Sequence, residues 1–228
     1  MFYDMKRNVF IIFSMVCCLA FVSLSEDAFS QQRRHTTYYE QRATLFEELP
    51  TSEKDIIFLG NSITDGGEWG ELFQNEHCKN RGISGDVCDG VLDRLETITK
   101  GRPAKVFLMI GINDLGRGGD PDTVAMKTRQ IVKRIKAESP RTEIYIQSVL
   151  PTNDHYGLFG GHTARWKDIP VTNNLLRQVA EDEGVTYIDL FSLFADEEGK
   201  MNIKYSNDGL HLTGKGYLVW RDAVKRYL

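Results

Sequence analysis

Short apolar runs alternate with amphipathic stretches along most of the 228-residue chain. Five runs are predicted strands, and the near-continuous apolar character of the clearest ones is the pattern of parallel strands that are buried on both faces of a sheet. They lie at residues 55–60, 78–83, 104–111, 142–150 and 184–190, and the second is the weakest. Helical spacing fills the intervals at about 66–75, 86–99, 121–138, 170–183 and 214–228. This alternation predicts an α/β protein with an open five-stranded parallel sheet and right-handed crossovers.

The first thirty residues have a different pattern. Lys6 and Arg7 precede an apolar run over residues 9–24, and small residues follow it at 23–25 and 28–30. This is typical of a secretory signal peptide, and the run is short for a membrane span. We expect a signal peptide over residues 1–30, with cleavage after Ser30 or, as second choice, Ser25. An uncleaved anchor is the alternative, and either predicts export to the periplasm or the extracellular space.

No repeat, linker or low-complexity tract divides the remainder, so a single domain is expected over residues 31–228, beginning with a helix. The chain carries 28 Lys and Arg against 32 Asp and Glu, a net charge of −4 spread along its length. This argues against a nucleic-acid partner, which would require a basic stripe.

Of the four cysteines, Cys78 and Cys88 remain after signal cleavage. Two buried free thiols are expected, with a disulfide as the alternative.

In open α/β sheets, ligands bind beyond the carboxyl ends of the strands. Ser62 follows the first predicted strand and begins a helix, where its own N–H shares the positive helix end that suits an oxyanion. A purely structural capping serine is the alternative. The G-x-S-x-G elbow of α/β-hydrolases is absent, since Thr64 stands at its second glycine. Any serine hydrolase of this sequence must therefore have another fold.

Two further residues follow the next strands. Gly85 lies in the segment NRGISGD, where glycines allow the backbone to expose an N–H that can act as a second oxyanion donor. Asn113 lies in IGIND and can aim an uncharged amide donor into the same cleft. Ordinary tight turns are the alternative for both.

Asp208 and His211 lie three residues apart near the carboxyl end, close enough to meet within one turn. The Asp can fix the tautomer of the ring, which leaves the other nitrogen free to take a proton from Ser62. The alternatives are a surface loop or a metal site formed with Asp65. The other four histidines show no paired ligand spacing, so neither a metal nor a cofactor is expected.

Taken together, the segments FLGNSITDGG, NRGISGD, IGIND and NDGLHLTGKGY resemble the blocks of the SGNH hydrolases, also called the GDSL esterase/lipase family. The resemblance covers roughly residues 55–228. It implies a flavodoxin-like three-layer α/β/α fold and a serine esterase mechanism. By position, Ser62 is the nucleophile, His211 the general base and Asp208 its partner. The oxyanion donors are then Gly85, Asn113 and the Ser62 N–H.

One position departs from the family pattern, because Asn61 stands where Gly-Asp-Ser has its acid. Asn retains local hydrogen bonding but loses a negative charge, so we expect a changed turn and retained activity.

The segment 151–169, which also contains Phe159, follows a strand end and is the candidate for selectivity. Short acyl esters are the expected substrates, O-acetyl groups on small molecules or oligosaccharides above all. The alternatives are a lipid esterase like the lysophospholipases or the acetylhydrolases of platelet-activating factor, a non-catalytic carbohydrate-binding module, and a metal-dependent phosphoesterase. The expected substrate-binding residues are Asn61, Tyr156, His162, Arg165 and Trp166.

Overall fold

The computed structural model describes residues 35–228. The predicted signal peptide and both of its cleavage sites lie outside the described residues. Nowhere in residues 35–228 is a helix both long and apolar enough to cross a membrane.

Five parallel strands form one sheet in the order β2-β1-β3-β4-β5. Each strand lies inside one of the five apolar runs, so the predicted sheet is confirmed. The strands are β1 Ile56–Gly60, β2 Cys78–Gly82, β3 Lys105–Met109, β4 Glu143–Gln147 and β5 Thr186–Ile188.

Helices occupy the intervals between the strands and both ends of the domain. The longer ones are α2 Thr37–Glu48, α8 Pro121–Glu138, α10 Asp168–Glu183 and α12 Gly214–Val224. The short ones are α3 Ser62–Asp65, α4 Trp69–Phe73, α5 Cys88–Asp93, α6 Glu96–Thr99, α7 Ile112–Gly116, α9 Gly160–Thr163 and α11 Phe191–Phe194, with 3₁₀ turns η1 Asp154–Tyr156 and η2 Lys225–Tyr227.

Two predicted helices differ from the observed ones. The helix expected at about 66–75 is replaced by the single turn α3 and by α4, and the one at 86–99 is divided into α5 and α6. The break after α3 has a local cause, because the Trp69 indole Nε1 donates to the carbonyl of Thr64 at 2.9 Å. The chain therefore turns back at Gly66 and Gly67, and the helix that was predicted to begin at Ser62 is a single turn, separate from α4.

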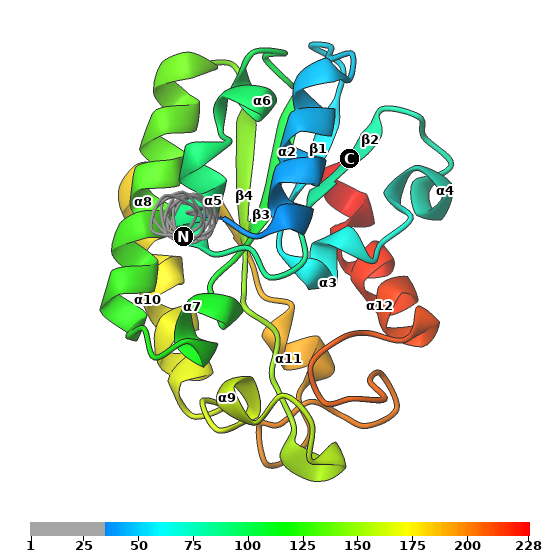
Figure 1. The fold of residues 1–228 in the computed structure, drawn as a ribbon, viewed down its shortest axis with the longest axis vertical. Helices are drawn as coiled ribbons and strands as arrows, with labels where there is room; N and C mark the ends of the chain where they lie inside the picture. Colours follow the sequence, from blue (N-terminus) through cyan, green and yellow to red (C-terminus); the bar gives the residue numbers. More distant parts are fainter. Residues whose placement is uncertain (1–34) are drawn as a thin grey trace, which may run out of the picture. The chain divides into compact units, whose positions relative to one another are not determined.

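The helices lie in two groups on the two faces of the sheet (Figure 1). Helix α8 packs between α5 and α10, and α4 packs against α12. Figure 1 shows α8 and α10 on the opposite side of the strands from α12. The chain thus has the three-layer α/β/α architecture that the resemblance implied.

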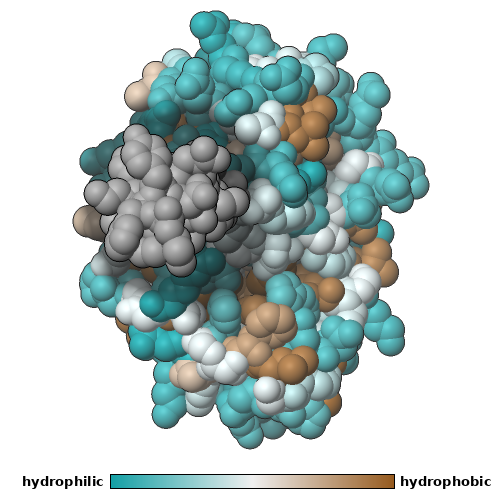
Figure 2. All heavy atoms as spheres, in the orientation of Figure 1, coloured by the Kyte–Doolittle hydropathy of each residue, from teal (hydrophilic) through white to brown (hydrophobic). Residues whose placement is uncertain are grey.

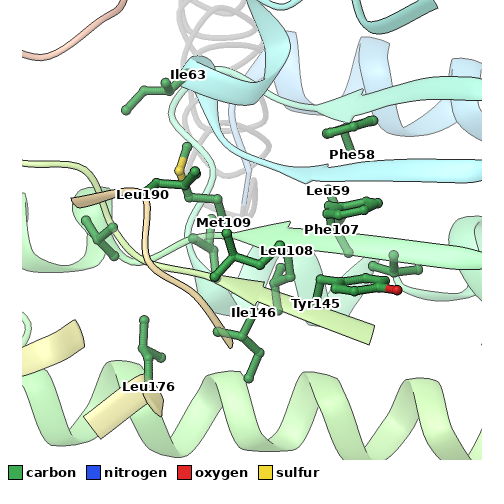
Figure 3. Packing of buried hydrophobic residues seen from close by; sticks show 14 of the residues in the cluster. Phe58, Leu59, Ile63, Phe107, Leu108, Met109, Tyr145, Ile146, Leu176 and Leu190 are labelled. Carbon is green, nitrogen blue, oxygen red and sulfur yellow. The ribbon is translucent and has the colours of Figure 1, made fainter. Parts of the chain in front are cut away.

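Aromatic rings fill one face of the sheet. Phe58, Phe107 and Tyr145 are register partners on β1, β3 and β4, and their rings stack at centroid distances of 5.1 and 4.5 Å. The Trp69 ring of α4 stacks on Phe58 at 4.1 Å, and Trp220 of α12 meets Trp69 edge-on. Figure 3 shows Phe58, Phe107 and Tyr145 in this row. The row fixes the strands of the central sheet relative to one another, and therefore their carboxyl ends.

Candidate active site

Ser62, His211 and Asp208 lie within hydrogen-bond distance of one another. Ser62 is the first residue of α3, directly beyond the end of β1. His211 precedes α12, and its Nε2 lies 3.0 Å from Ser62 Oγ although 149 positions separate them in the chain. On the other side of the ring, His211 Nδ1 lies 2.7 Å from Asp208 Oδ2. An alcohol, an imidazole and a carboxylate thus form one hydrogen-bonded chain.

The Asp208 carboxylate is held firmly in its loop. Its Oδ1 accepts from the N–H of Leu210 at 2.8 Å, from the N–H of His211 at 2.7 Å and from the Ser206 hydroxyl at 3.3 Å. Burial raises the pKa of this carboxyl, but the two N–H groups and the ring outweigh burial and hold the pKa below its ordinary value. Asp208 therefore stays ionised at neutral pH and can only accept, so the His211 proton is fixed on Nδ1. The bare Nε2 then faces Ser62.

Gly85 lies in the loop after β2 with φ at +79°, a conformation that glycine adopts readily. The Gly85 carbonyl accepts from the guanidinium of Arg117 at 2.6 Å. Among residues 35–228, no group accepts a hydrogen bond from the Gly85 N–H. This N–H is therefore a donor without an acceptor in the part of the chain that the structure describes.

Asn113 is buried in the first turn of α7, and its Nδ2 donates to the carbonyl of Asp86 at 2.8 Å. An amide nitrogen has two hydrogens, so one remains for a further acceptor. Asp86 follows Gly85 directly, so Asn113 and Gly85, which the sequence predicts as partners, lie in one hydrogen-bonded unit.

A buried ion pair connects this unit to the strand that carries Ser62. Arg94 and Asp86 are both almost completely buried, and Arg94 Nε and Nη2 each lie 2.9 Å from Asp86 Oδ2. The same guanidinium donates to the carbonyl of Gly60 at 3.2 Å. Nothing in the sequence pattern marks Arg94, because its partners lie on other elements.

Three side chains of the segment 151–169 contact the site. The Tyr156 hydroxyl donates to the carbonyl of Ser206 at 2.9 Å, in the loop of Asp208. His162 Nε2 lies 2.9 Å from Asn113 Oδ1. The exposed ring of Phe159, whose backbone has φ at +52°, meets the His211 ring edge-on at 5.1 Å. Such a conformation is strained for a bulky residue and is found mainly at functional sites.

Two other residues of this segment make their contacts away from the triad. Arg165 pairs with Asp168 at 2.6 Å and donates to the carbonyl of Gly119. Trp166 has the ammonium groups of Lys167 and Lys200 over its ring, each at 5.3 Å. The structure therefore does not bring Arg165 and Trp166 into contact with Ser62 or His211.

With this geometry in view, comparison with known proteins is informative. The sequence model of the GDSL-like lipase/acylhydrolase family matches residues 58–219. The chain belongs to this family. It is therefore a carboxylic ester hydrolase, as the sequence predicted.

Individual relatives of this acylhydrolase carry more specific names. The platelet-activating factor acetylhydrolase IB subunit alpha2 of the rat is 28% identical over 171 residues, which cover 72% of each chain. A solved structure from Streptococcus pneumoniae, named for platelet activating factor, has a TM-score of 0.77 at 26% identity and covers 92% of this chain and 98% of its own. An acetylxylan esterase of Geobacillus stearothermophilus has a TM-score of 0.62 at 20% identity, covering 78% and 94%.

Asn61 has a local role in this acylhydrolase. Its side chain is almost fully buried, and its Oδ1 accepts from the N–H of Ile63 at 3.1 Å as the N-cap of α3. This is the turn hydrogen bond that an Asp would also make. We therefore assign Asn61 to the turn that presents Ser62, and its part in binding substrate stays a prediction.

Two further expectations concern acids and thiols. Asp65 pairs with Arg42 at 3.5 Å and accepts from the Tyr38 hydroxyl. Within residues 35–228, no group of three His, Cys, Asp or Glu side chains is arranged to hold a metal ion.

Cys78 and Cys88 are both buried and free, so the expected thiols, and not the alternative disulfide, are observed.

Proposed function

We propose that this acylhydrolase is a serine esterase that removes short acyl groups, O-acetyl above all, from carbohydrate. Its nucleophile is Ser62, its general base His211 and its orienting acid Asp208. The observation that carries the proposal is the continuous hydrogen-bonded chain from Ser62 Oγ through the His211 ring to Asp208.

The chemistry follows from the protonation states of these groups. Ser62 Oγ attacks the ester carbonyl while His211 Nε2 takes its proton, and the imidazolium is stabilised by the ionised Asp208. The imidazolium then protonates the leaving alcohol, and an acyl-enzyme remains on Ser62. Water, activated by the same imidazole, attacks the acyl-enzyme and releases the acid.

The negative oxygen of each tetrahedral intermediate needs donors. The Ser62 N–H has no intrahelical acceptor because it lies in the first turn of α3. The Gly85 N–H has none among the described residues, and Asn113 has one amide hydrogen to spare. These three donors form the proposed oxyanion hole. Loss of one such donor costs about 10²–10³ in kcat.

The substrate proposal rests on the openness of the site. The His211 side chain is 32% exposed, which fits an ester presented on a larger molecule better than one enclosed in a deep tunnel. Tyr156 and Phe159 both expose aromatic rings beside the triad, and such rings can stack on sugar faces. A structural neighbour named as an acetylxylan esterase supports the same substrate class.

A lipid acetyl ester is the second candidate, and one observation favours it. Apolar surface gathers over the α9 and α11 side of the molecule in Figure 2, and the exposed large apolar side chains of this region include Leu158, Phe159, Leu193 and Ile203. The rat relative named as a platelet-activating factor acetylhydrolase points the same way. The first thirty residues add a separate proposal, export to the periplasm or the extracellular space, which N-terminal sequencing of the exported protein tests.

A panel of esters tests the proposal. Initial rates are measured with acetylated xylo-oligosaccharides, a 2-acetyl phospholipid and p-nitrophenyl esters of increasing acyl length. We expect the acetylated sugars to have the highest kcat/KM, the rate to fall with acyl length, and Ser62→Ala to abolish turnover. A higher kcat/KM for the phospholipid would favour the second candidate. Equal rates for wild type and Ser62→Ala would refute the mechanism, and a protein inactive on every ester would favour a carbohydrate-binding module.

A further inference from the structure

One side chain of the segment 151–169, that of His162, contacts the proposed oxyanion donor Asn113. His162 belongs to α9, which packs against α7, the helix whose second residue is Asn113. The two side chains meet at 2.9 Å, between His162 Nε2 and Asn113 Oδ1. They are 49 positions apart in the chain, so the contact exists only through the tertiary fold.

The hydrogen-bond partners settle which atom donates. Asp86 contributes a carbonyl, which can only accept, so the Asn113 nitrogen must face it. The Asn113 oxygen then faces His162 Nε2, which must carry a proton. Burial lowers the pKa of His162, and the nearby positive charge of Arg117 lowers it further. The ring is therefore neutral at neutral pH, and its single N–H is held on Nε2 by Asn113.

Close packing brings the ring to this position. A methyl group at Gly116, at the end of α7, would lie 2.5 Å from the His162 ring carbon Cδ2. The absence of a side chain at Gly116 thus allows the imidazole to lie against α7 and reach Asn113.

We infer that His162 is a positioning residue for the oxyanion hole, which donates to Asn113 Oδ1 and thereby holds the amide with its second hydrogen free for the substrate oxygen. The inference rests on the proposed function and deepens it. His162 and Asp86 hold the two ends of the amide, so the amide neither rotates nor exchanges its oxygen and nitrogen. A hydrogen bond accepted at the oxygen also polarises the amide and strengthens its N–H as a donor.

A double-mutant cycle tests the inference with p-nitrophenyl acetate as substrate. His162→Phe keeps a ring against Gly116 but removes the donor, and we expect kcat to fall about tenfold with KM little changed. His162→Gln restores a donor and is expected to recover most of that loss. In an Asn113→Ala background, His162→Phe is expected to change kcat by less than about twofold, because the group it positions is gone.

Matched variants separate positioning from damage to the fold. His155→Phe makes the same change at an exposed histidine of the same segment and is expected to leave kcat unchanged. Gly116→Ala keeps both His162 and Asn113 but displaces the ring, and is expected to reproduce the loss seen with His162→Phe. Thermal melting of each variant identifies any that does not fold, and Gly116→Ala and His162→Gln keep the test decisive if His162→Phe fails.

Two results would overturn the inference. One is a loss from His162→Phe that is equally large in the Asn113→Ala background. The other is a rise in KM with kcat unchanged, which would make His162 a substrate contact instead. Failure of the proposed function has a different signature, namely wild-type kcat in Asn113→Ala or activity in Ser62→Ala.

Discussion

Replacement of Asp208 by Asn tests the electrostatics of the site with almost no change in volume. In the native protein, Oδ1 accepts three hydrogen bonds from its own loop, and Oδ2 accepts from the His211 ring. An Asn at this position keeps its oxygen toward the three loop donors, because the reversed amide would set its N–H₂ against them. Its nitrogen then faces His211 Nδ1, which must become an acceptor.

This exchange moves the ring proton to Nε2, the nitrogen that lies 3.0 Å from Ser62 Oγ. The imidazole would then donate to the serine and could no longer accept its proton. In serine hydrolases with this arrangement, the Asp→Asn change costs about 10⁴ in kcat. That factor corresponds to about 5 kcal/mol of lost transition-state stabilisation. Stability should change little, because the loop hydrogen bonds survive.

The assay is kcat for p-nitrophenyl acetate at neutral pH, with thermal melting alongside it. Asp196→Asn is the matched control, since Asp196 also accepts from two N–H groups of its own turn, those of Glu198 and Lys200, and no hydrogen bond or ion pair within residues 35–228 joins it to an imidazole. We expect its activity to equal that of the wild type. If Asp208→Asn folds normally and retains more than about a tenth of the native kcat, the orienting role of Asp208 is refuted.

Three further predictions concern other parts of the molecule. Arg94→Met removes the guanidinium that pairs with the buried Asp86 carboxylate and should lower the free energy of unfolding by about 3–5 kcal/mol in urea titrations, whereas a change below about 1 kcal/mol would contradict the structural role of the pair. Burial raises the pKa of the Cys78 thiol to about 11 and that of the Cys88 thiol well above its ordinary value, so both stay protonated at pH 8. Peptide mapping should therefore show iodoacetamide on both cysteines only after unfolding. Rapid alkylation of the folded protein would contradict their burial. Phe159→Ala removes the ring beside the triad and should raise kcat/KM for butanoate relative to acetate esters by about tenfold, and an unchanged ratio would show that the ring does not limit acyl length.

The sheet could be predicted from the sequence because each strand is locally encoded. Runs such as residues 56–60 are apolar throughout, as a strand covered on both faces requires, and each ends at a turn. The resemblance then identified Ser62, Asp208 and His211 as neighbours, and the structure places them in contact. The helix boundaries near Ser62 were less predictable, since a side-chain-to-backbone hydrogen bond from the Trp69 indole accompanies the break in the helix after α3.

The supporting contacts of the site lie beyond sequence reasoning. Arg94 is an ordinary charged residue in the turn between α5 and α6, and its role becomes visible only from its contacts with β1 and Asp86 in the folded chain. His162 was expected to bind substrate, but its ring nitrogen faces Asn113. The exposed ring of Phe159 belongs to the site only because it contacts the His211 ring, and His211 is distant from Phe159 in the sequence. Side-chain contacts of this kind join residues that are distant in the sequence. They produce no local pattern from which they could be predicted.

Covalent labelling tests the central claim, that Ser62 is an activated nucleophile, most directly. The folded protein is treated with a fluorophosphonate, digested and mapped by mass spectrometry. The account predicts one phosphonyl group per molecule, located on Ser62, and a labelling rate that falls steeply in His211→Ala. A label on another residue, or undiminished labelling without the imidazole, would contradict it.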